Sequence, residues 1–183
     1  MNSILRIAEE AVTQRDWDWI IANIRPGLTY LSIMISKIQL SDNEFDKLVD
    51  WIIWAPAIKS QVLSAYTLDR YKELIEQRHK WIDISLYQSL SISMLDRFSD
   101  YIRWGDIIYN DTLTDLHIEI FADRINWADL ALDRHLSRTM ILRHMDFLDP
   151  RNMWSGVNHY TWSELNDEGL LNNKKNLHRT ENE

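Results

Sequence analysis

The sequence has no cysteine and little of the two residues that interrupt helices, with only 4 glycines and 3 prolines among 183 residues. The lack of cysteine excludes disulfides and thiolate chemistry, and it is compatible with a reducing compartment. The scarcity of glycine and proline argues against a long linker, because linkers and turns concentrate these residues. We therefore expect one packed helical domain.

Long apolar runs are also missing. The most apolar segment, residues 28–40, is interrupted by Lys37 and is too short to span a bilayer. The first residues carry Glu9 and Glu10 instead of a basic segment followed by an apolar core, so they do not form a secretory signal. These absences predict a soluble, cytoplasmic protein without a membrane partner.

Signatures of catalysis are absent as well. No glycine-rich phosphate loop, nucleophile elbow or metal-binding spacing of the six histidines occurs. We expect no cofactor, no metal and no enzymatic activity, although an unrecognised site assembled from distant segments remains an alternative. The net charge of −8 disfavours direct binding to nucleic-acid phosphates and leaves a basic protein as the expected partner.

What the sequence does contain is a repeat anchored by tryptophan. Trp81, Trp104 and Trp127 are spaced by 23 residues, and spacings of 27 separate them from Trp54 and Trp154. Counting each tryptophan as position zero, apolar residues recur at positions 3, 9, 14 and 21, and serine or threonine recurs at position 10. The clear units are 54–80, 81–103, 104–126 and 127–153.

These positions predict a pair of helices in each unit. Positions 14, 17 and 21 share one helix face, and the serine or threonine at position 10 can cap that helix. Neither helix can bury its apolar face alone, so the units must stack. We predict an all-α solenoid of short helix–turn–helix repeats of about 23–27 residues. It forms a single domain over residues 1–171 with caps at both ends, followed by a polar, disordered tail at 172–183.

Three details of the repeat can be tested in a structure. The four extra residues within 72–80 add about one helical turn and keep the packing face in phase. In the last clear unit, Asp149 and Pro150 should stop the helix. Before Trp54 the register is ambiguous, since either Trp54 or Trp51 can be the anchor. We prefer Trp54, which places Leu31 at position zero of the preceding unit.

The form W-x-x-I…Q-x-L-S…L-x-x-F-x-D-x-I-x-W resembles short Trp-anchored repeats of uncharacterised proteins from large DNA viruses and phages. The likeness covers residues 54–153 and is carried by Trp81, Ile84, Gln88, Leu90, Ser91, Leu95, Phe98, Asp100, Ile102 and Trp104. The resemblance implies a viral helical-repeat protein, located in the host cytoplasm, and it implies no activity or cofactor. The chain departs from the pattern at Asp111, Arg134 and His144.

The tryptophans themselves could form a stacking surface for nucleic-acid bases. Each one recurs together with the apolar positions, however, and tryptophan at an interface between units buries a large apolar area. We therefore interpret the tryptophans as core residues. His144, at the position of a phenylalanine, is interpreted as a hydrogen-bonded core histidine.

The candidate partner-binding residues lie at two repeat positions. Position 19 is acidic in every clear unit, at Glu73, Asp100, Asp123 and Asp146. An arginine stands three residues earlier in three units, so these acids form either solvated intrahelical ion pairs or an acidic ridge for a basic partner.

The second position is the turn between the two helices of a unit. Gln61 and Gln88 at position 7 either bond the turn backbone or, with Tyr87, Asp111 and Arg134, form a variable edge that contacts a partner. The predicted function is a non-enzymatic protein–protein interaction module. The alternative is an acidic decoy or inhibitor that occupies the nucleic-acid-binding site of a host protein.

Overall fold

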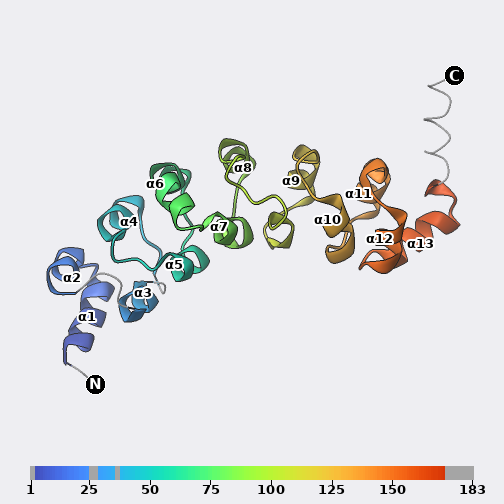
Figure 1. Ribbon diagram of the computed structural model, residues 1–183. Helices are drawn as coiled ribbons and strands as arrows, with labels where there is room; N and C mark the ends of the chain where they lie inside the picture. Colours follow the sequence, from blue (N-terminus) through green and yellow to red (C-terminus); the bar gives the residue numbers. More distant parts are fainter. Residues whose placement is uncertain (1–2, 25–28, 36–37, 172–183) are drawn as a thin grey trace. The chain divides into compact units, whose positions relative to one another are not determined.

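The computed structural model describes residues 3–24, 29–35 and 38–171 of the chain (Figure 1). Within these ranges there are thirteen α-helices and two 3-10 helices, and no strand. The prediction of an all-α protein is confirmed. No helix among the described residues is both long and apolar enough to cross a membrane. The predicted disordered tail at 172–183 lies outside the described residues.

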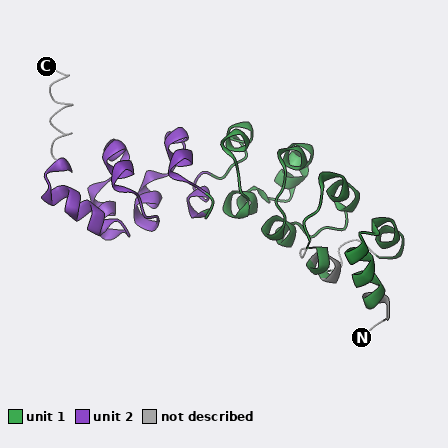
Figure 2. Cartoon of the chain, turned by 180° about the vertical axis from the view of Figure 1, so that it is seen from behind, with its two compact units in different colours: residues 1–103, 110–112 green, residues 104–109, 113–183 purple. Residues whose placement is uncertain are grey.

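The chain divides into two compact units (Figure 2). Unit 1 comprises residues 1–103 and 110–112, and unit 2 comprises residues 104–109 and 113–183. Each unit is described by itself below. The expectation that residues 1–171 form a single domain stays a prediction.

Unit 1 contains eight described helices in two series (Figure 1). They are α1 (Ser3–Gln14), α2 (Trp17–Asn23), α3 (Thr29–Ile35), α4 (Asp42–Leu48), α5 (Trp54–Ser60), α6 (Ala65–Gln77), α7 (Trp81–Tyr87) and α8 (Ile92–Arg97). The odd-numbered helices α1, α3, α5 and α7 contact one another in succession, and α2, α4 and α6 do the same. Helices therefore alternate between two layers along this unit.

Unit 2 has the same kinds of element in shorter form. They are η1 (Ile107–Tyr109), α9 (Asp115–Ile120), α10 (Trp127–Asp133), α11 (Arg138–Arg143), η2 (Met145–Phe147), α12 (Pro150–Ser155) and α13 (His159–Asp167). Helix α10 packs on α12, α11 packs on α13, and α12 also packs on α13. The helices are too short to be stable alone, so tertiary packing must hold them.

Most of the helices that come second in a sequence unit begin with a side-chain cap, as the sequence predicts. The hydroxyls of Ser64, Ser91 and Ser137 accept hydrogen bonds from backbone N–H groups three residues on, at 3.0, 3.3 and 3.1 Å. Thr114 begins α9 with a capping box, and Asn126 caps α10. These contacts confirm the predicted caps, each of which satisfies an N–H that the helix leaves without an intrahelical partner.

The core consists mainly of the predicted apolar positions. Trp54, Trp81 and Trp127 are buried, and Trp104 is half-buried. Aromatic rings from position 20 stack on two of these indoles. Tyr101 lies 4.9 Å from Trp81 and Phe147 lies 5.3 Å from Trp127, measured between ring centroids. For the three buried tryptophans the interpretation as core residues is confirmed.

His144 occupies the place of a phenylalanine beside Trp127. Its ring lies 4.8 Å from the Trp127 ring, between centroids, and it is half-buried. The corresponding contacts elsewhere are Trp81 with Phe98 and Trp104 with Phe121. The histidine therefore keeps the packing role of the aromatic residue that it replaces.

Trp154 differs from the other anchors, and the core interpretation is wrong for it, because half of its surface is exposed. Pro150, not Trp154, begins α12, and the carboxylate of Asp149 caps that helix. Proline suits the first helical position, since the N–H that it lacks would have no intrahelical acceptor there. The prediction that Asp149 and Pro150 stop a helix is also wrong, because α11 already ends at Arg143.

Pro150 lies 23 residues after Trp127, so it takes the position of the anchor. Met153, three residues later, is fully buried and fills the apolar position. The extra turn expected in residues 72–80 is present, since α6 has 13 residues and buries Ile75 completely. The sequence unit that begins at Trp127 therefore has 23 residues, and among the four clear units the one that begins at Trp54 carries the insertion.

Candidate functional site

A recurring contact, which we call the turn clamp, connects the first helix of one sequence unit to the turn of the preceding one. The side-chain oxygen of Gln88 accepts a hydrogen bond from the N–H of Leu63 at 2.8 Å. Its side-chain nitrogen donates to the carbonyls of Gln61, at 2.7 Å, and Ile58. Gln88 is only 2% exposed, so these bonds satisfy backbone groups that water cannot reach.

Gln61 makes the same three contacts one unit earlier. Its oxygen accepts from the N–H of Leu40 at 2.8 Å, and its nitrogen donates to Ile35 at 3.1 Å and Ile38 at 2.6 Å. Both clamps contact carbonyls at positions 4 and 7 and an N–H at position 9, provided that Leu31 is position zero. This equivalence confirms the preference for Trp54 as the anchor.

Asn158 repeats the clamp near the end of the described chain. Its side-chain oxygen accepts from the N–H of Leu136 at 2.7 Å, and its nitrogen donates to the carbonyls of Ala131 and Arg134, both at 2.8 Å. The residue is buried. A shorter amide side chain therefore performs the role of glutamine where the anchor tryptophan is missing.

The structure changes the assignment of two predicted partner-binding residues. Gln88 faces the interior, and Arg134 is half-buried, donating to the carbonyls of Ile108, at 3.0 Å, and Leu113. Neither presents its polar group as a surface contact. Asp111 is exposed, and the neighbouring Asn110 instead bonds the preceding turn.

The remaining turn candidate, Tyr87, is on the surface. The residue is 47% exposed, and the ammonium of Lys59 on α5 lies 4.3 Å from its ring centroid. This cation–π contact joins α5 and α7 at their exposed side. The structure leaves about half of Tyr87 exposed for further contact.

All four acidic residues at position 19 are exposed and follow a second helix or lie near its end. Glu73 lies in α6 and Asp146 in η2, while Asp100 and Asp123 lie in the turns after α8 and α9. Glu73, Asp100 and Asp123 make no ion pair or hydrogen bond within the described part of the chain. None of the four caps a helix.

A fifth acidic residue belongs to this set. Asp50 stands at position 19 counted from Leu31, and it is exposed in the turn after α4. Sequence reasoning missed it because the register before Trp54 was ambiguous. We call Asp50, Glu73, Asp100, Asp123 and Asp146 the position-19 acids.

Arg70 and Arg97 at position 16 do not pair as intrahelical i, i+3 partners of Glu73 and Asp100. Arg70 contacts Asp46 at 3.1 Å, and Arg97 contacts Asp69 at 3.0 Å. Each acid lies on the preceding second helix, and Arg143 pairs with Glu119 in the same way. For Arg70 and Arg97, the alternative of solvated i, i+3 pairs is therefore wrong, and ion pairs between neighbouring helices take their place.

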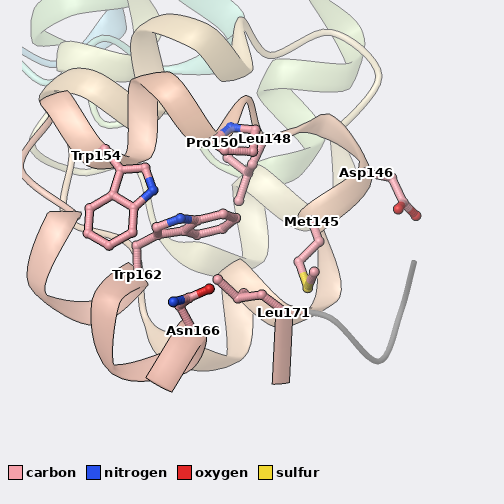
Figure 3. Close-up of a pocket in the computed structure, with 8 residues that line it drawn as sticks. All are labelled: Met145, Asp146, Leu148, Pro150, Trp154, Trp162, Asn166 and Leu171. Carbon is pink, nitrogen blue, oxygen red and sulfur yellow. The ribbon is translucent and has the colours of Figure 1, made fainter. Parts of the chain in front are cut away.

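A pocket of about 370 Å³ opens beside α12 and α13 in unit 2 (Figure 3). It is lined by Met145, Asp146, Leu148, Pro150, Trp154, Trp162, Asn166 and Leu171. Figure 3 shows the two indoles close together on one side, whereas Asp146 lies apart on the far side with its carboxylate pointing away from the other labelled side chains. Asp146 is the one predicted site residue that lines this pocket.

Acidic groups dominate the charge of this region. No lysine occurs between residues 104 and 171, and all five arginines in that range are engaged with a ring, a carboxylate or backbone carbonyls. Helix α13 also carries the exposed acids Glu164 and Asp167. The arginines of this region are thus engaged in contacts within the chain, whereas several carboxylates face solvent.

Two ion pairs hold carboxylates in their charged form near the pocket. Hydrogen bonds from the side chain and then the backbone of Arg151 lower the pKa of Asp149 below its ordinary value. The guanidinium of Arg138 lowers the pKa of Glu168 in the same way. Both carboxylates therefore stay ionised at neutral pH.

Sequence reasoning missed the pocket because Trp154 was placed in the core. The available signal was the spacing of 23 residues from Trp127 to Pro150, which moves Trp154 from position zero to position 4. Among the described residues, no group of three histidine, aspartate or glutamate side chains is arranged to hold a metal ion. Comparisons with protein-family models, curated proteins and solved structures found no match.

Proposed function

We propose that the chain is a helical-repeat solenoid that acts as a non-enzymatic scaffold for a protein partner. The recurring turn clamps of Gln61, Gln88 and Asn158 support this proposal, since equivalent residues contact equivalent backbone groups of the preceding unit. Repeat proteins of this kind bury their apolar positions between units and leave the remaining positions free for binding.

The partner is a protein with a basic surface. A basic partner is supported by the exposure of all five position-19 acids. Three of them, Glu73, Asp100 and Asp123, also make no ion pair in the described part of the chain. An acidic surface attracts a basic partner and accelerates its association, and it does so less at high salt. The absence of lysine over residues 104–171 adds to the same field.

Charge reversal tests the proposal. We expect the double variant Asp100→Lys/Asp123→Lys to capture at least tenfold less of the specific partner from native cells, because like charges now oppose it. The matched control is Glu10→Lys/Asp96→Lys, which makes the same change of charge at exposed acids outside position 19. Equal capture by both variants, at unchanged melting temperature, would refute the role of the position-19 acids.

A second candidate is the acidic decoy, which occupies the nucleic-acid-binding site of a host protein. The exposed carboxylates favour it, because they can take the place of phosphates, and the resemblance to viral repeats extends it to a viral protein acting in the host cytoplasm. The decoy predicts that single-stranded oligonucleotides release the captured partner competitively. A partner that binds the chain and an oligonucleotide at the same time would leave only the scaffold function.

A further inference from the structure

The pocket beside α12 and α13 has a mostly apolar lining that contains two unpaired hydrogen-bond donors. Its walls include the side chains of Met145, Leu148 and Leu171. The half-exposed indole of Trp154 and the indole of Trp162, a residue only 5% exposed, form one side. The volume of about 370 Å³ lies at the lower end of the range for ligand-binding pockets. Apolar walls alone would accept any apolar group, so the donors must define the ligand.

The two donors are the indole N–H groups of Trp154 and Trp162. Neither group has a hydrogen-bond acceptor within the described part of the chain. Figure 3 shows the nitrogen of each indole on the side of its ring that faces the other indole. The two N–H groups therefore converge beside the apolar walls, so that one acceptor atom between the rings can bond both.

The N–H of Trp162 differs from the indole N–H groups of the core. Trp127 donates to the carbonyl of Ala122 at 2.8 Å, while the N–H groups of Trp54 and Trp81 have no acceptor and are enclosed. The N–H of Trp162 also has no acceptor but is not enclosed, because this buried residue lines the pocket. A buried donor without an acceptor costs free energy, which a ligand that supplies an acceptor recovers.

The charge around the pocket favours a neutral acceptor. Glu164 and Asp167 on α13 are exposed carboxylates, no lysine occurs over residues 104–171, and the arginines of that range are already engaged. A carboxylate or phosphate would therefore enter without a free cation to oppose its charge. An amide carbonyl carries no charge and accepts two hydrogen bonds, one for each indole.

The third polar group of the lining fits a peptide group as well. The side-chain amide of Asn166 lines the pocket and has no partner within the described part of the chain. An amide both donates and accepts, so it can bond a peptide backbone next to the carbonyl that the indoles hold. The polar groups and the apolar walls together complement a short stretch of uncharged peptide.

We propose that this pocket binds a segment of the partner through one apolar side chain and the backbone carbonyl beside it, which accepts hydrogen bonds from Trp154 and Trp162. The inference rests on the proposed function, because it takes the partner to be a protein, and it names the contact that gives specificity. Well-packed aromatic side chains usually supply most of the binding energy of an interface. The position-19 acids would then steer association, while the pocket would slow dissociation.

The test is a titration of the full chain, labelled with ¹⁵N, with the probe peptide acetyl-Gly-Leu-Gly-amide. The indole N–H signals of Trp154 and Trp162, assigned with Trp154→Phe and Trp162→Phe, should shift and saturate. A peptide with a thioamide in place of the leucine carbonyl keeps the shape and accepts hydrogen bonds less well, so it should bind roughly fivefold more weakly. The alanine peptide should bind at least about tenfold more weakly, because it buries three fewer carbon atoms. The glutamate peptide should cause no shift.

Two variants locate the donors. Trp154→Phe keeps an aromatic ring and removes one donor, so the preference for the carbonyl over the thioamide should fall to roughly twofold. Tyr160→Phe should leave the preference unchanged, since Tyr160 is an exposed aromatic residue of α13 outside the pocket lining. Equal affinities for the two peptides in the unaltered chain, or a preference that survives Trp154→Phe in full, would overturn the inference.

Other occupants of the pocket give different results. A second copy of the chain would shift the Trp154 signal on dilution without any peptide. The chain's own tail would do so on Leu177→Ala substitution, which removes the one apolar residue of 172–183, and either result overturns the inference. If Trp154→Phe leaves partner capture intact while Asp100→Lys/Asp123→Lys abolishes it, the pocket inference fails and the proposed function stands. The opposite pattern refutes the role of the position-19 acids alone.

Discussion

Residues 81–103 and residues 150–171 share the turn clamp but differ at the anchor position, which is tryptophan in the first stretch and proline in the second. In the first, Trp81 begins α7, is fully buried and is stacked against Tyr101. In the second, Pro150 begins α12, and the tryptophan stands four residues later with half of its surface exposed. Both stretches retain the turn clamp, from Gln88 and from Asn158.

The difference shows that clamp and anchor are separable. The clamp satisfies backbone groups of the preceding turn, and an amide suffices for it. The anchor fills volume between helices, and in the second stretch Pro150 takes its position while Met153 keeps the buried apolar residue at position 3. Trp154, which does not occupy the anchor position, lies at the surface instead and lines the pocket.

Replacing Trp81 or Trp154 with alanine should give the largest difference in stability between the two stretches. Trp81→Ala should lower the free energy of unfolding by about 3–5 kcal/mol, because it empties a fully packed site. The Trp81 indole N–H has no hydrogen-bond acceptor in the described structure, so the loss is one of packing. Trp154→Ala should cost about 1 kcal/mol or less, since its side chain is half-exposed.

Urea denaturation followed by circular dichroism measures both values. Melting curves of the two variants that coincide would show that position 4 is as important for the core as position zero, and the contrast between the stretches would disappear.

The clamps should behave alike in both stretches. Gln88→Ala and Asn158→Ala each leave a buried backbone N–H and two carbonyls without the side chain that bonds them, so each should cost about 2–3 kcal/mol. Gln77→Ala is the control, because Gln77 is exposed at the end of α6 and should change stability by no more than about 0.5 kcal/mol. Denaturant midpoints give the comparison, and a tolerated Gln88→Ala would show that water replaces the clamp.

Much of the fold could be predicted from local spacing. The caps at Ser64, Ser91 and Ser137 follow from their place before an apolar helix face, and the structure has all three. Such contacts lie within one turn of chain, so sequence order determines them. The extra turn of α6 could be predicted for the same reason, because about 3.6 residues restore the helix face.

Contacts between units could be predicted less well. The sequence left open whether Gln88 bonds backbone or a partner, because the groups that it contacts lie 25–30 residues away. Likewise Arg97 was expected to pair within its own helix and instead contacts Asp69 on α6. The pocket depends on the start of α12 at Pro150. The spacing of the tryptophans alone does not predict this start. Long-range geometry, not residue type, decides these contacts.

Helix caps give a smaller contrast between the stretches. Ser91→Ala should cost about 1 kcal/mol, since its hydroxyl accepts from the N–H of Met94 in the first turn of α8. Ser155→Ala should cost clearly less, because Ser155 is exposed and its hydroxyl donates to a carbonyl within α12 and caps nothing. Equal losses, measured by thermal unfolding of both variants, would contradict a capping role for Ser91.

The smallest expected effect is the loss of stability at acidic pH that comes from Asp149. Asp149 caps α12 as a carboxylate, and hydrogen bonds from the side chain and backbone of Arg151 lower its pKa below the ordinary 3.8. A carboxyl with a lowered pKa in the folded state stabilises above its unfolded pKa and loses this contribution as the pH falls through the folded value. Asp149→Ser keeps a cap that does not titrate. The stability advantage of the unaltered chain over Asp149→Ser should therefore be constant between pH 5 and pH 7, about where the carboxyl is fully ionised.

Below about pH 4 that advantage should shrink, because the unfolded state now binds the proton more readily than the folded one. The deficit of Ser91→Ala should stay the same over the whole range, since a hydroxyl cap carries no charge. Urea midpoints at pH 7, 5 and 3 for the three proteins decide the matter. A parallel loss in Asp149→Ser and the unaltered chain would mean that Arg151 and Asp149 do not hold the start of α12, and that other interactions must position Trp154 at the edge of the pocket.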